Sequence, residues 1–130
     1  MNEACAVVLA AGKGTRMKSD LPKVLCRVLD RPMIHFVLDA LREAGIRRQI
    51  VVVGHQADAV RDELAGRDES IEFVRQEQQL GTGHAVQVCR PALESQSGPT
   101  IVVAGDSPLI QPSSLTKLLD HFERTRPALL

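Results

Sequence analysis

A glycine-rich loop follows the first apolar run of the sequence, and two cations lie beyond it. Residues 7–11 lead into Gly12 and Gly14, and Arg16 and Lys23 follow. Glycines let the backbone approach a ligand closely, and successive backbone N–H groups in such a turn bind anions. The guanidinium of Arg16 and the ammonium of Lys23 suit phosphate oxygens. The loop therefore predicts a phosphate-binding site, with a surface turn carrying two solvated cations as the alternative.

Two well-known phosphate-binding loops do not fit this segment. The dinucleotide fingerprint requires glycine or alanine at its sixth position, where this sequence has Met17. The P-loop requires Gly-Lys-Ser/Thr after an earlier glycine, but Gly12-Lys13 is followed by Gly14. Neither motif accounts for the loop, so its function depends on the residues that accompany it in the fold.

A second cluster runs from Gln76 to His84 and combines glutamine amides with a glycine turn. Amides both donate and accept hydrogen bonds, which suits the Watson–Crick edge of a pyrimidine. Gly81 and Gly83 would allow a base to approach the backbone, and the helix expected next presents its N-terminus to anions. A polar loop is the alternative interpretation, with His84 as a packing or capping residue.

A third cluster begins at Gly105-Asp106. A carboxylate directly after a buried strand is well placed for Mg²⁺, which usually takes one or two carboxylates together with substrate phosphates and waters. An Asx-turn or a helix cap is the alternative role for this aspartate.

Among the histidines, His35 and His121 are expected to be ordinary helix residues, and His55 could border the site.

The elements that must position these clusters alternate between strand and helix. Short apolar runs at 5–10, 50–53 and 100–104 predict buried strands, and residues 71–75 predict a further strand with Ile71 and Phe73 on one face. Apolar residues at helical spacing predict four helices. The first opens at Pro32 and ends at Gly45, with the stripe Ile34, Val37, Leu38 and Leu41, and the second covers 57–64 and stops near Gly66. The third follows Gly81-Thr82-Gly83 with the stripe Ala85, Val88, Cys89 and Ala92, and Pro91 should kink or end it; the fourth starts at Pro112 and has Leu115, Leu118, Leu119 and Phe122 on one face. This order predicts an α/β fold with a parallel sheet, right-handed crossovers and helices on both faces. Ligands bind beyond the carboxyl ends of such strands, so the three clusters are expected at one edge.

Composition limits the function classes. The 130 residues carry 16 basic and 16 acidic side chains and 44% hydrophobic residues, which fits one globular domain and gives no electrostatic reason to expect nucleic acid or a membrane as partner. Phenylalanine is the only aromatic type present, so a base-stacking surface for single strands is not expected. Cys5, Cys26 and Cys89 are odd in number and have no CxxC spacing, which favours reduced thiols and no zinc site. A soluble, cytoplasmic protein is expected.

Taken together, the motifs resemble a known family. Leu9-Ala10-Ala11-Gly12-x-Gly14-Thr15-Arg16-Met17 with Leu21-Pro22-Lys23 is similar to the signature of the sugar-1-phosphate nucleotidyltransferases. With Gln76-x-x-Gln79-Leu80-Gly81-Thr82-Gly83-His84-Ala85 and Gly105-Asp106-x-Pro108-Leu109, the chain resembles the uridylyltransferase domain of the bacterial bifunctional N-acetylglucosamine-1-phosphate uridyltransferase/glucosamine-1-phosphate acetyltransferases. The first motif also occurs in related cytidylyl- and guanylyltransferases.

The resemblance implies a role for each matching residue. Leu9, Ala10, Ala11, Gly12 and Gly14 would line the nucleotide, while Arg16 and Lys23 would hold the phosphates and act in catalysis. Gln76 would read the uracil with Gly81 and Thr82, and Asp106 would bind Mg²⁺. The implied reaction is attack of a sugar-1-phosphate oxygen on the α-phosphorus of UTP with release of pyrophosphate.

The resemblance also implies what residues 1–130 would not contain. The chain is expected to be the N-terminal, nucleotide-binding half of a Rossmann-like nucleotide-diphospho-sugar transferase domain. The sugar-binding half, the second metal ligand and the acetyltransferase β-helix domain would lie outside it. Such a fragment is expected to bind UTP and Mg²⁺, to transfer little alone and to self-associate. A cytidylyl- or guanylyltransferase and a non-catalytic nucleotide-binding module are the alternatives.

Overall fold

The computed structural model describes residues 4–11, 23–54, 56–67, 70–77, 81–94, 96, 98–107 and 109–125. Its main sheet has four parallel strands in the order β5-β4-β1-β6, namely β1 (Cys5–Leu9), β4 (Arg48–Val53), β5 (Ser70–Arg75) and β6 (Thr100–Ala104). The helices are α1 (Met33–Glu43), α2 (Ala57–Leu64), α3 (Thr82–Val88), α4 (Arg90–Leu93) and α5 (Pro112–Thr125). Between β1 and α1 lie a 3-10 helix, η1 (Lys23–Leu25), and an antiparallel pair of short strands, β2 (Arg27–Val28) and β3 (Arg31–Pro32).

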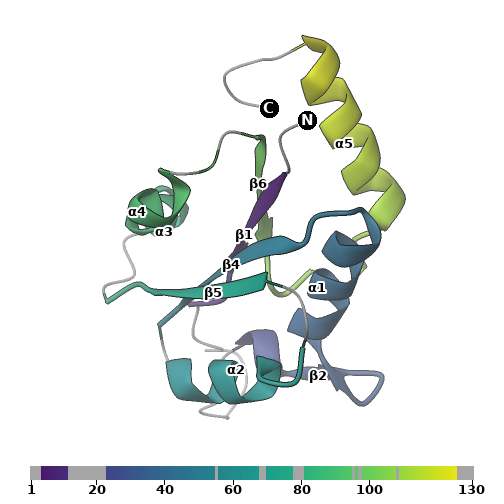
Figure 1. Cartoon of the computed structure of the whole chain (residues 1–130). Coiled ribbons are helices and arrows are strands. Elements are labelled where there is room, and N and C mark those ends of the chain that lie inside the picture. The colour runs from purple at the N-terminus through teal and green to yellow at the C-terminus, as the bar shows by residue number, and fades with distance from the viewer. Residues whose placement is uncertain are drawn as a thin grey trace.

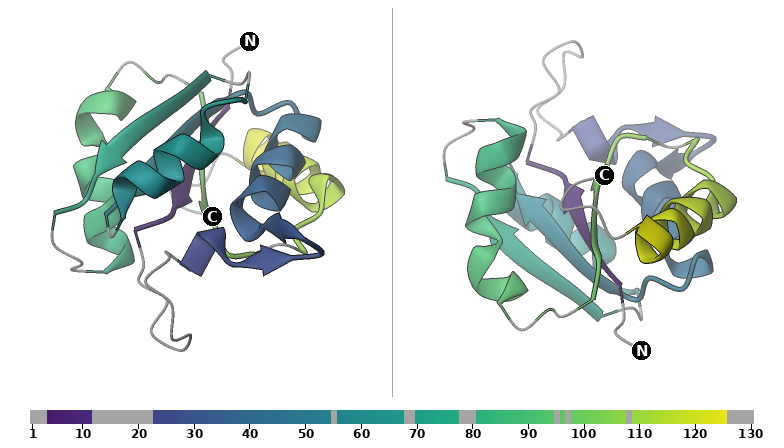
Figure 2. Two further views of the ribbon diagram at one scale, coloured as in Figure 1. Left: turned by 90° about the horizontal axis from the view of Figure 1, so that it is seen from below. Right: turned by 90° about the horizontal axis from the view of Figure 1, so that it is seen from above.

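The path of the chain through the sheet reverses once. It runs outward from β1 to β4 and β5, and then returns to β6 on the other side of β1. Figures 1 and 2 show α3 and α4 on one side of the sheet, with α1 and α5 on the other. The predicted α/β class with a parallel sheet and helices on both faces is thus confirmed. In such sheets the point where the strand order reverses, here between β1 and β6, is where ligands bind.

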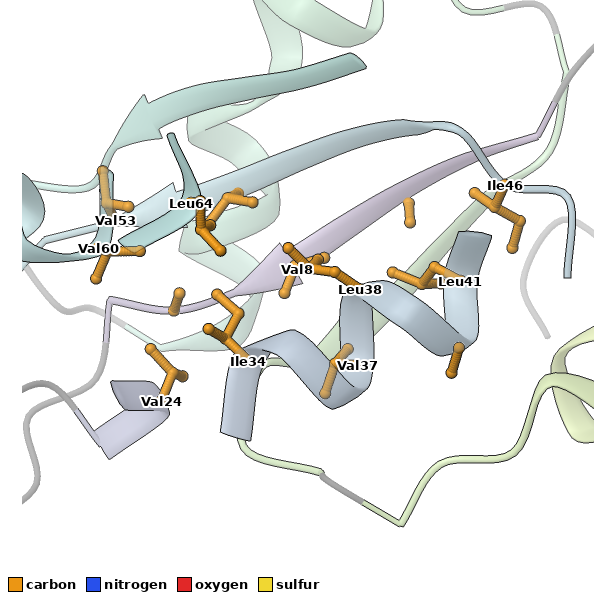
Figure 3. Close-up of a cluster of buried hydrophobic side chains, with 14 of the residues drawn as sticks. Val8, Val24, Ile34, Val37, Leu38, Leu41, Ile46, Val53, Val60 and Leu64 are labelled. Atoms are coloured by element: carbon orange, nitrogen blue, oxygen red, sulfur yellow. The ribbon is translucent and has the colours of Figure 1, made fainter. Parts of the chain in front are cut away.

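The larger of two buried clusters lies between the sheet and the helices α1, α2 and α5 (Figure 3). The whole predicted stripe of α1 is buried in it, together with Val8 of β1 and Val51 and Val53 of β4. Complete burial of each such aliphatic side chain stabilises the fold by about 1.5–3 kcal/mol. The stripe of α1 therefore holds this helix firmly against the centre of the sheet.

The second cluster covers the opposite face of the sheet. Alternate residues of a strand point to opposite faces, so Val7, Ile50 and Val52 pack against Ala85 and Cys89 of the α3–α4 segment. Burial raises the pKa of the Cys89 thiol to about 11, with a smaller contribution from the neighbouring Cys5. A thiol held in its protonated form is a poor nucleophile, so Cys89 serves packing.

Pro91 interrupts the third predicted helix, as expected. α3 ends at Val88, and a separate turn of helix, α4, begins at Arg90 with Pro91 in its first turn. α3 begins at Thr82, earlier than the sequence predicts, because Thr82 and Gly83 belong to the helix instead of preceding it.

Two other details differ from the sequence-based predictions. Pro32 is the N-cap of α1 and not its first helical residue, because pairing with Arg27 in the β2–β3 hairpin holds it extended at ψ 138°. Leu118 was predicted on the apolar face of α5, but it is 39% exposed while Leu115 is buried. Gly45, by contrast, has the left-handed φ of +87° that the predicted helix end requires. No helix in the described part of the chain is long and apolar enough to cross a membrane.

Candidate functional site

The carboxyl ends of the strands are joined by backbone hydrogen bonds that continue past the strands themselves. The N–H of Gly105 donates to Leu9 O at 2.9 Å, and the N–H of Ala10 donates to Val52 O at 2.9 Å. On the far side of β4, the N–H of Gln76 donates to Val53 O at 2.8 Å. These bonds bring three of the predicted segments, 9–11, 76 and 105–106, to one edge of the sheet.

This carboxyl edge runs across the sheet from the end of β5 to the end of β6. Residues 9–11 and Asp106 follow the adjacent strands β1 and β6, whereas Gln76 follows β5, two strands beyond β1. Neighbouring strands lie about 4.8 Å apart, so Gln76 and Asp106 are separated by roughly 14 Å across the sheet. An extended ligand along this edge could therefore meet an amide at one end and a carboxylate at the other.

Gly105 is the point of closest packing at this edge. A Cβ added there would lie 2.9 Å from Val24 Cγ1, 3.0 Å from Leu9 O and 3.4 Å from Val8 Cγ1. Real Cβ contacts are essentially never shorter than 3.0 Å, so only glycine fits unless Val24 shifts. Lys23 precedes Val24 and Asp106 follows Gly105 in the sequence. The resemblance assigns Lys23 to phosphate binding and Asp106 to metal binding.

Gln76 is almost fully buried at 5% exposure. Its Nε2 lies 3.4 Å from the carbonyl oxygen of Gly81 and 2.9 Å from Nδ1 of His84. Gly81 has a φ of +102°, which glycine adopts freely, and its carbonyl also accepts the first helical bond of α3 from Ala85 N at 3.1 Å. The amide of Gln76 thus fastens the turn before α3 to the end of β5.

The segment after Lys23 is anchored to the core by η1. Val24 and Leu25 are buried, and the N–H of Met33 donates to Cys26 O at 3.0 Å across the base of the hairpin. Val24, the residue that follows Lys23 in η1, thus belongs to the larger core (Figure 3).

A charged network holds the β2–β3 hairpin against the helices. Arg31 contacts Asp39 of α1 at 2.5 Å, and Arg67, with a side chain only 8% exposed, contacts the other oxygen of Asp39 at 2.6 Å. Burial alone would raise the pKa of Asp39, but the hydrogen bonds from Arg31 and Arg67 outweigh it and hold that pKa below its ordinary value. His35 joins the network, because its ring nitrogens lie 2.9 Å from Arg67 Nη1 and 3.0 Å from Glu63 Oε2.

The structure places only part of the predicted site. Leu9, Ala10, Ala11, Gln76, Gly81 and Asp106 lie along the carboxyl edge. Gly12, Gly14, Arg16 and His55 lie outside the described residues, as do the side chains of Lys23 and Thr82. Roles for all of these residues remain predictions.

The residues present suit one divalent cation with a phosphate ligand. Asp106 is a half-buried carboxylate at the switch point, and a single carboxylate plus substrate phosphates is a common Mg²⁺ arrangement. In the described part of the chain, no group of three or more His, Cys, Asp or Glu is placed to hold a metal ion. Among the described residues, Asp106 is thus the carboxylate that could hold a metal at this edge, with phosphate oxygens of a nucleotide as further ligands.

The sequence did not predict two properties of residues at this edge. His84 was interpreted as a packing or capping residue, but its Nδ1 contacts the side chain of Gln76. Gln56, the N-cap of α2, has a left-handed backbone at φ 56° and ψ 44°, which is uncommon for a non-glycine residue. The sequence carries no signal for either property, since both depend on how the segment after one strand meets the next helix.

Comparison with known proteins identifies the family. A family model described as the MobA-like NTP transferase domain matches residues 6–130. The chain belongs to this family. It is also 54% identical over 121 residues to the Bifunctional protein GlmU of Exiguobacterium sp., an alignment that covers 93% of this chain and 26% of that protein. These matches confirm the resemblance to nucleotidyltransferases that the three motifs indicated.

Solved structures share the fold of this NTP transferase domain. UDP-glucose pyrophosphorylase complexed with UDP-glucose superposes with a TM-score of 0.80 at 23% identity, covering 97% of this chain and 55% of that one. Rv0371C of Mycobacterium tuberculosis in complex with manganese superposes with a TM-score of 0.70 at 26% identity, covering 91% and 58%. The chain thus spans about a quarter of the length of the curated relatives and somewhat more than half of the solved ones.

Proposed function

We propose that this domain binds UTP and Mg²⁺ as the nucleotide-binding part of a UDP-N-acetylglucosamine pyrophosphorylase. The reaction joins UTP and N-acetylglucosamine-1-phosphate and releases pyrophosphate, in the cytoplasmic synthesis of cell-wall precursors. The observation that carries the proposal is the carboxyl edge, along which Leu9–Ala11, Gln76 and Gly105–Asp106 lie in a chain 54% identical to a Bifunctional protein GlmU. The length and polarity of that edge suit a nucleotide laid across β5, β4, β1 and β6.

In this proposal the two ends of the carboxyl edge bind different parts of the nucleotide. The base lies over β5, where Gln76 and the Gly81 turn read its edge, and the backbone of Leu9 to Ala11 lines the nucleoside. The phosphates lie toward β6, where Arg16 and Lys23 bind their oxygens. Bound Mg²⁺, held by Asp106, would neutralise phosphate charge.

Catalysis requires no covalent nucleophile from the protein. Holding the sugar phosphate and the triphosphate in line converts a bimolecular encounter into a positioned one, and fixed cations stabilise the charge that develops on the leaving pyrophosphate. Arg16 and Lys23 supply those fixed charges. The buried thiol of Cys89 and the packed histidine His35 take no part.

A binding test with the full 130-residue chain can decide the nucleotide. Calorimetric titration with UTP, CTP and GTP, each with Mg²⁺, should give the highest affinity for UTP. Asp106→Ala should weaken UTP binding about tenfold or more in the presence of Mg²⁺ and little without it, because one metal ligand is lost. Asp120→Ala removes an exposed carboxylate from α5 and serves as the matched control. Preference for GTP would rule out the uridylyl assignment.

A non-catalytic nucleotide-binding module is the second candidate, because an amide such as that of Gln76 and a carboxylate such as that of Asp106 can hold a nucleotide and its metal without transferring the nucleotidyl group. Pyrophosphate release from UTP and N-acetylglucosamine-1-phosphate separates the two. Release that Asp106→Ala abolishes supports the enzyme, whereas binding of UTP without any release supports the module.

A further inference from the structure

The side-chain amide of Gln76 has both of its hydrogens engaged within the protein. Its Nε2 lies 2.9 Å from His84 Nδ1 and 3.4 Å from Gly81 O. An amide nitrogen has two hydrogens, so these two partners account for both. The oxygen Oε1 is the atom of this side chain that remains for a ligand.

The Gly81 carbonyl decides which way the amide faces. A carbonyl oxygen can only accept, so a reversed amide would place Oε1 against Gly81 O and lose that bond. Because Nε2 of Gln76 faces both Gly81 O and His84 Nδ1, Nδ1 must accept the second hydrogen bond, which places the proton of the histidine ring on its Nε2. His84 therefore takes the stronger of the two bonds that orient Gln76.

Oε1 of Gln76 is not a fully buried atom left without a hydrogen-bond partner, since in the part of the chain that the structure describes Oε1 of Gln49 is the atom of that kind. Gln76 also lies at the carboxyl edge, one residue past the end of β5. An acceptor of fixed orientation thus stands where the proposed function puts the base.

We propose that His84 is a positioning residue that sets the pyrimidine preference by fixing Gln76 with its oxygen toward the base. This inference rests on the proposed function. An acceptor pairs with the N3–H of uracil, whereas N3 of cytosine is itself an acceptor and opposes Oε1. If the side-chain amide of Gln76 could rotate, its NH₂ group could donate to N3 of cytosine in one orientation and its oxygen could accept from N3–H of uracil in the other. The preference for UTP over CTP would then fall.

Three substitutions of His84 test this inference, with calorimetric affinities for UTP and CTP as the readout. The oxygen of an asparagine side chain is bonded to Cγ, as Nδ1 is in histidine, so His84→Asn keeps an acceptor near the native position. His84→Gln moves the acceptor one atom further out, and His84→Leu removes it. We expect the ratio of UTP to CTP affinity to fall about tenfold in His84→Leu and His84→Gln and to stay within about threefold of wild type in His84→Asn.

A matched control and a second measurement keep the outcomes distinct. Gln87→Leu alters an exposed residue of the same helix and should leave the ratio unchanged. An unchanged ratio in His84→Leu, with wild type still preferring UTP, would overturn this inference and leave the proposed function standing. A wild type that binds both nucleotides equally would overturn both.

The tautomer of His84 can be measured without any nucleotide. Nitrogen-15 chemical shifts of the free protein should show Nε2 protonated and Nδ1 unprotonated, with both side-chain amide protons of Gln76 in hydrogen bonds. Protonation of Nδ1 in the neutral ring would overturn the inference even if the nucleotide preference is as expected.

Discussion

At the scale of single residues, Gly105 is where the two proposed halves of the phosphate site touch. It precedes Asp106 and packs against Val24, the neighbour of Lys23, at a distance that leaves no room for a Cβ. A methyl group there requires the side chain of Val24, or the backbone at Leu9, to shift. Gly105→Ala should therefore weaken UTP binding with Mg²⁺ about tenfold and destabilise the fold by about 1–3 kcal/mol. Calorimetry and urea unfolding measure the two effects.

Gly66 provides the matched control, because a Cβ at that position meets nothing within 4 Å. Gly66→Ala should leave UTP affinity unchanged. Adding Val24→Ala to Gly105→Ala removes the closest of the crowding atoms and should recover part of the lost affinity. A Gly105→Ala protein that binds UTP as wild type does would show that the spacing between η1 and β6 is not critical.

Asp39 is the residue whose charge holds the hairpin in place. It accepts hydrogen bonds from Arg31 and from the buried guanidinium of Arg67, and its pKa is lowered by them despite the opposing effect of burial. Asp39→Asn should lower the free energy of unfolding near pH 7 by about 1–2 kcal/mol, since hydrogen bonds to charged groups are worth more than neutral ones.

The sign of the pH dependence follows from the lowered pKa. The folded pKa of Asp39 lies below its unfolded value of about 3.9, so its stabilisation is complete above that pH and is lost as pH falls through the folded pKa. The stability difference between wild type and Asp39→Asn should therefore be constant from about pH 5 to 8 and shrink below about pH 4. Asp120→Asn, on the exposed face of α5, should show neither effect. A difference that persists undiminished at low pH would assign the loss to packing instead of charge.

At the scale of elements, the β2–β3 hairpin combines a tight turn with unsuitable residues. Leu29 and Asp30 form its two-residue loop with φ of 54° and 63°, the left-handed geometry of a type I′ turn. A leucine in this conformation costs roughly 1–2 kcal/mol, whereas asparagine adopts it readily. Leu29→Asn should therefore raise the free energy of unfolding by about 1 kcal/mol.

Leu109 offers the same substitution without the strained backbone. It is 84% exposed, as Leu29 is at 87%, but it is not among the described residues with positive φ. Leu109→Asn should change stability by less than about 0.5 kcal/mol. Equal effects of both variants in urea unfolding would mean that the gain comes from removing an exposed leucine and not from relieving the turn.

The elements differ in how far the sequence predicts them. Segments with an apolar pattern of their own were predicted well, as the bounds of β6 at Thr100–Ala104 and the stripe of α1 show. The expected burial of β6 was wrong, because this strand has a neighbour on one side only in the described sheet and Ile101 is its one buried residue. The hairpin was not predicted, since strands of two residues have no periodicity and Leu29-Asp30 is not a usual turn pair. Its position depends on Arg67, which lies far along the chain from Arg31.

The same distinction applies to the candidate site. The sequence predicts which residues follow each strand, because a turn signal after an apolar run is local. It does not predict that Gly105 packs against Val24, or that His84 takes a hydrogen bond from Gln76. These contacts join segments that are neighbours only once the sheet has formed.

At the scale of the whole molecule, the sheet is covered unequally at its β6 edge. Val102 pairs in register with the fully buried Val7, so both side chains point toward the face that α3 and α4 cover. Val7 is completely buried there, but Val102 remains 41% exposed. Within the described sheet, β6 is also paired on one side only. An edge strand with an exposed β-branched side chain is a template for association.

We therefore expect the isolated chain to self-associate through β6. Sedimentation velocity over a hundredfold concentration range should show an average mass that rises with concentration. Val102→Lys should suppress that rise, because a charged side chain on an edge strand opposes pairing with a second strand. Leu118→Lys is the matched control, since Leu118 is 39% exposed but belongs to helix α5 and not to the edge strand. A wild-type protein that stays monomeric throughout would contradict association, and equal suppression by both lysine variants would assign it to general surface charge instead of to β6.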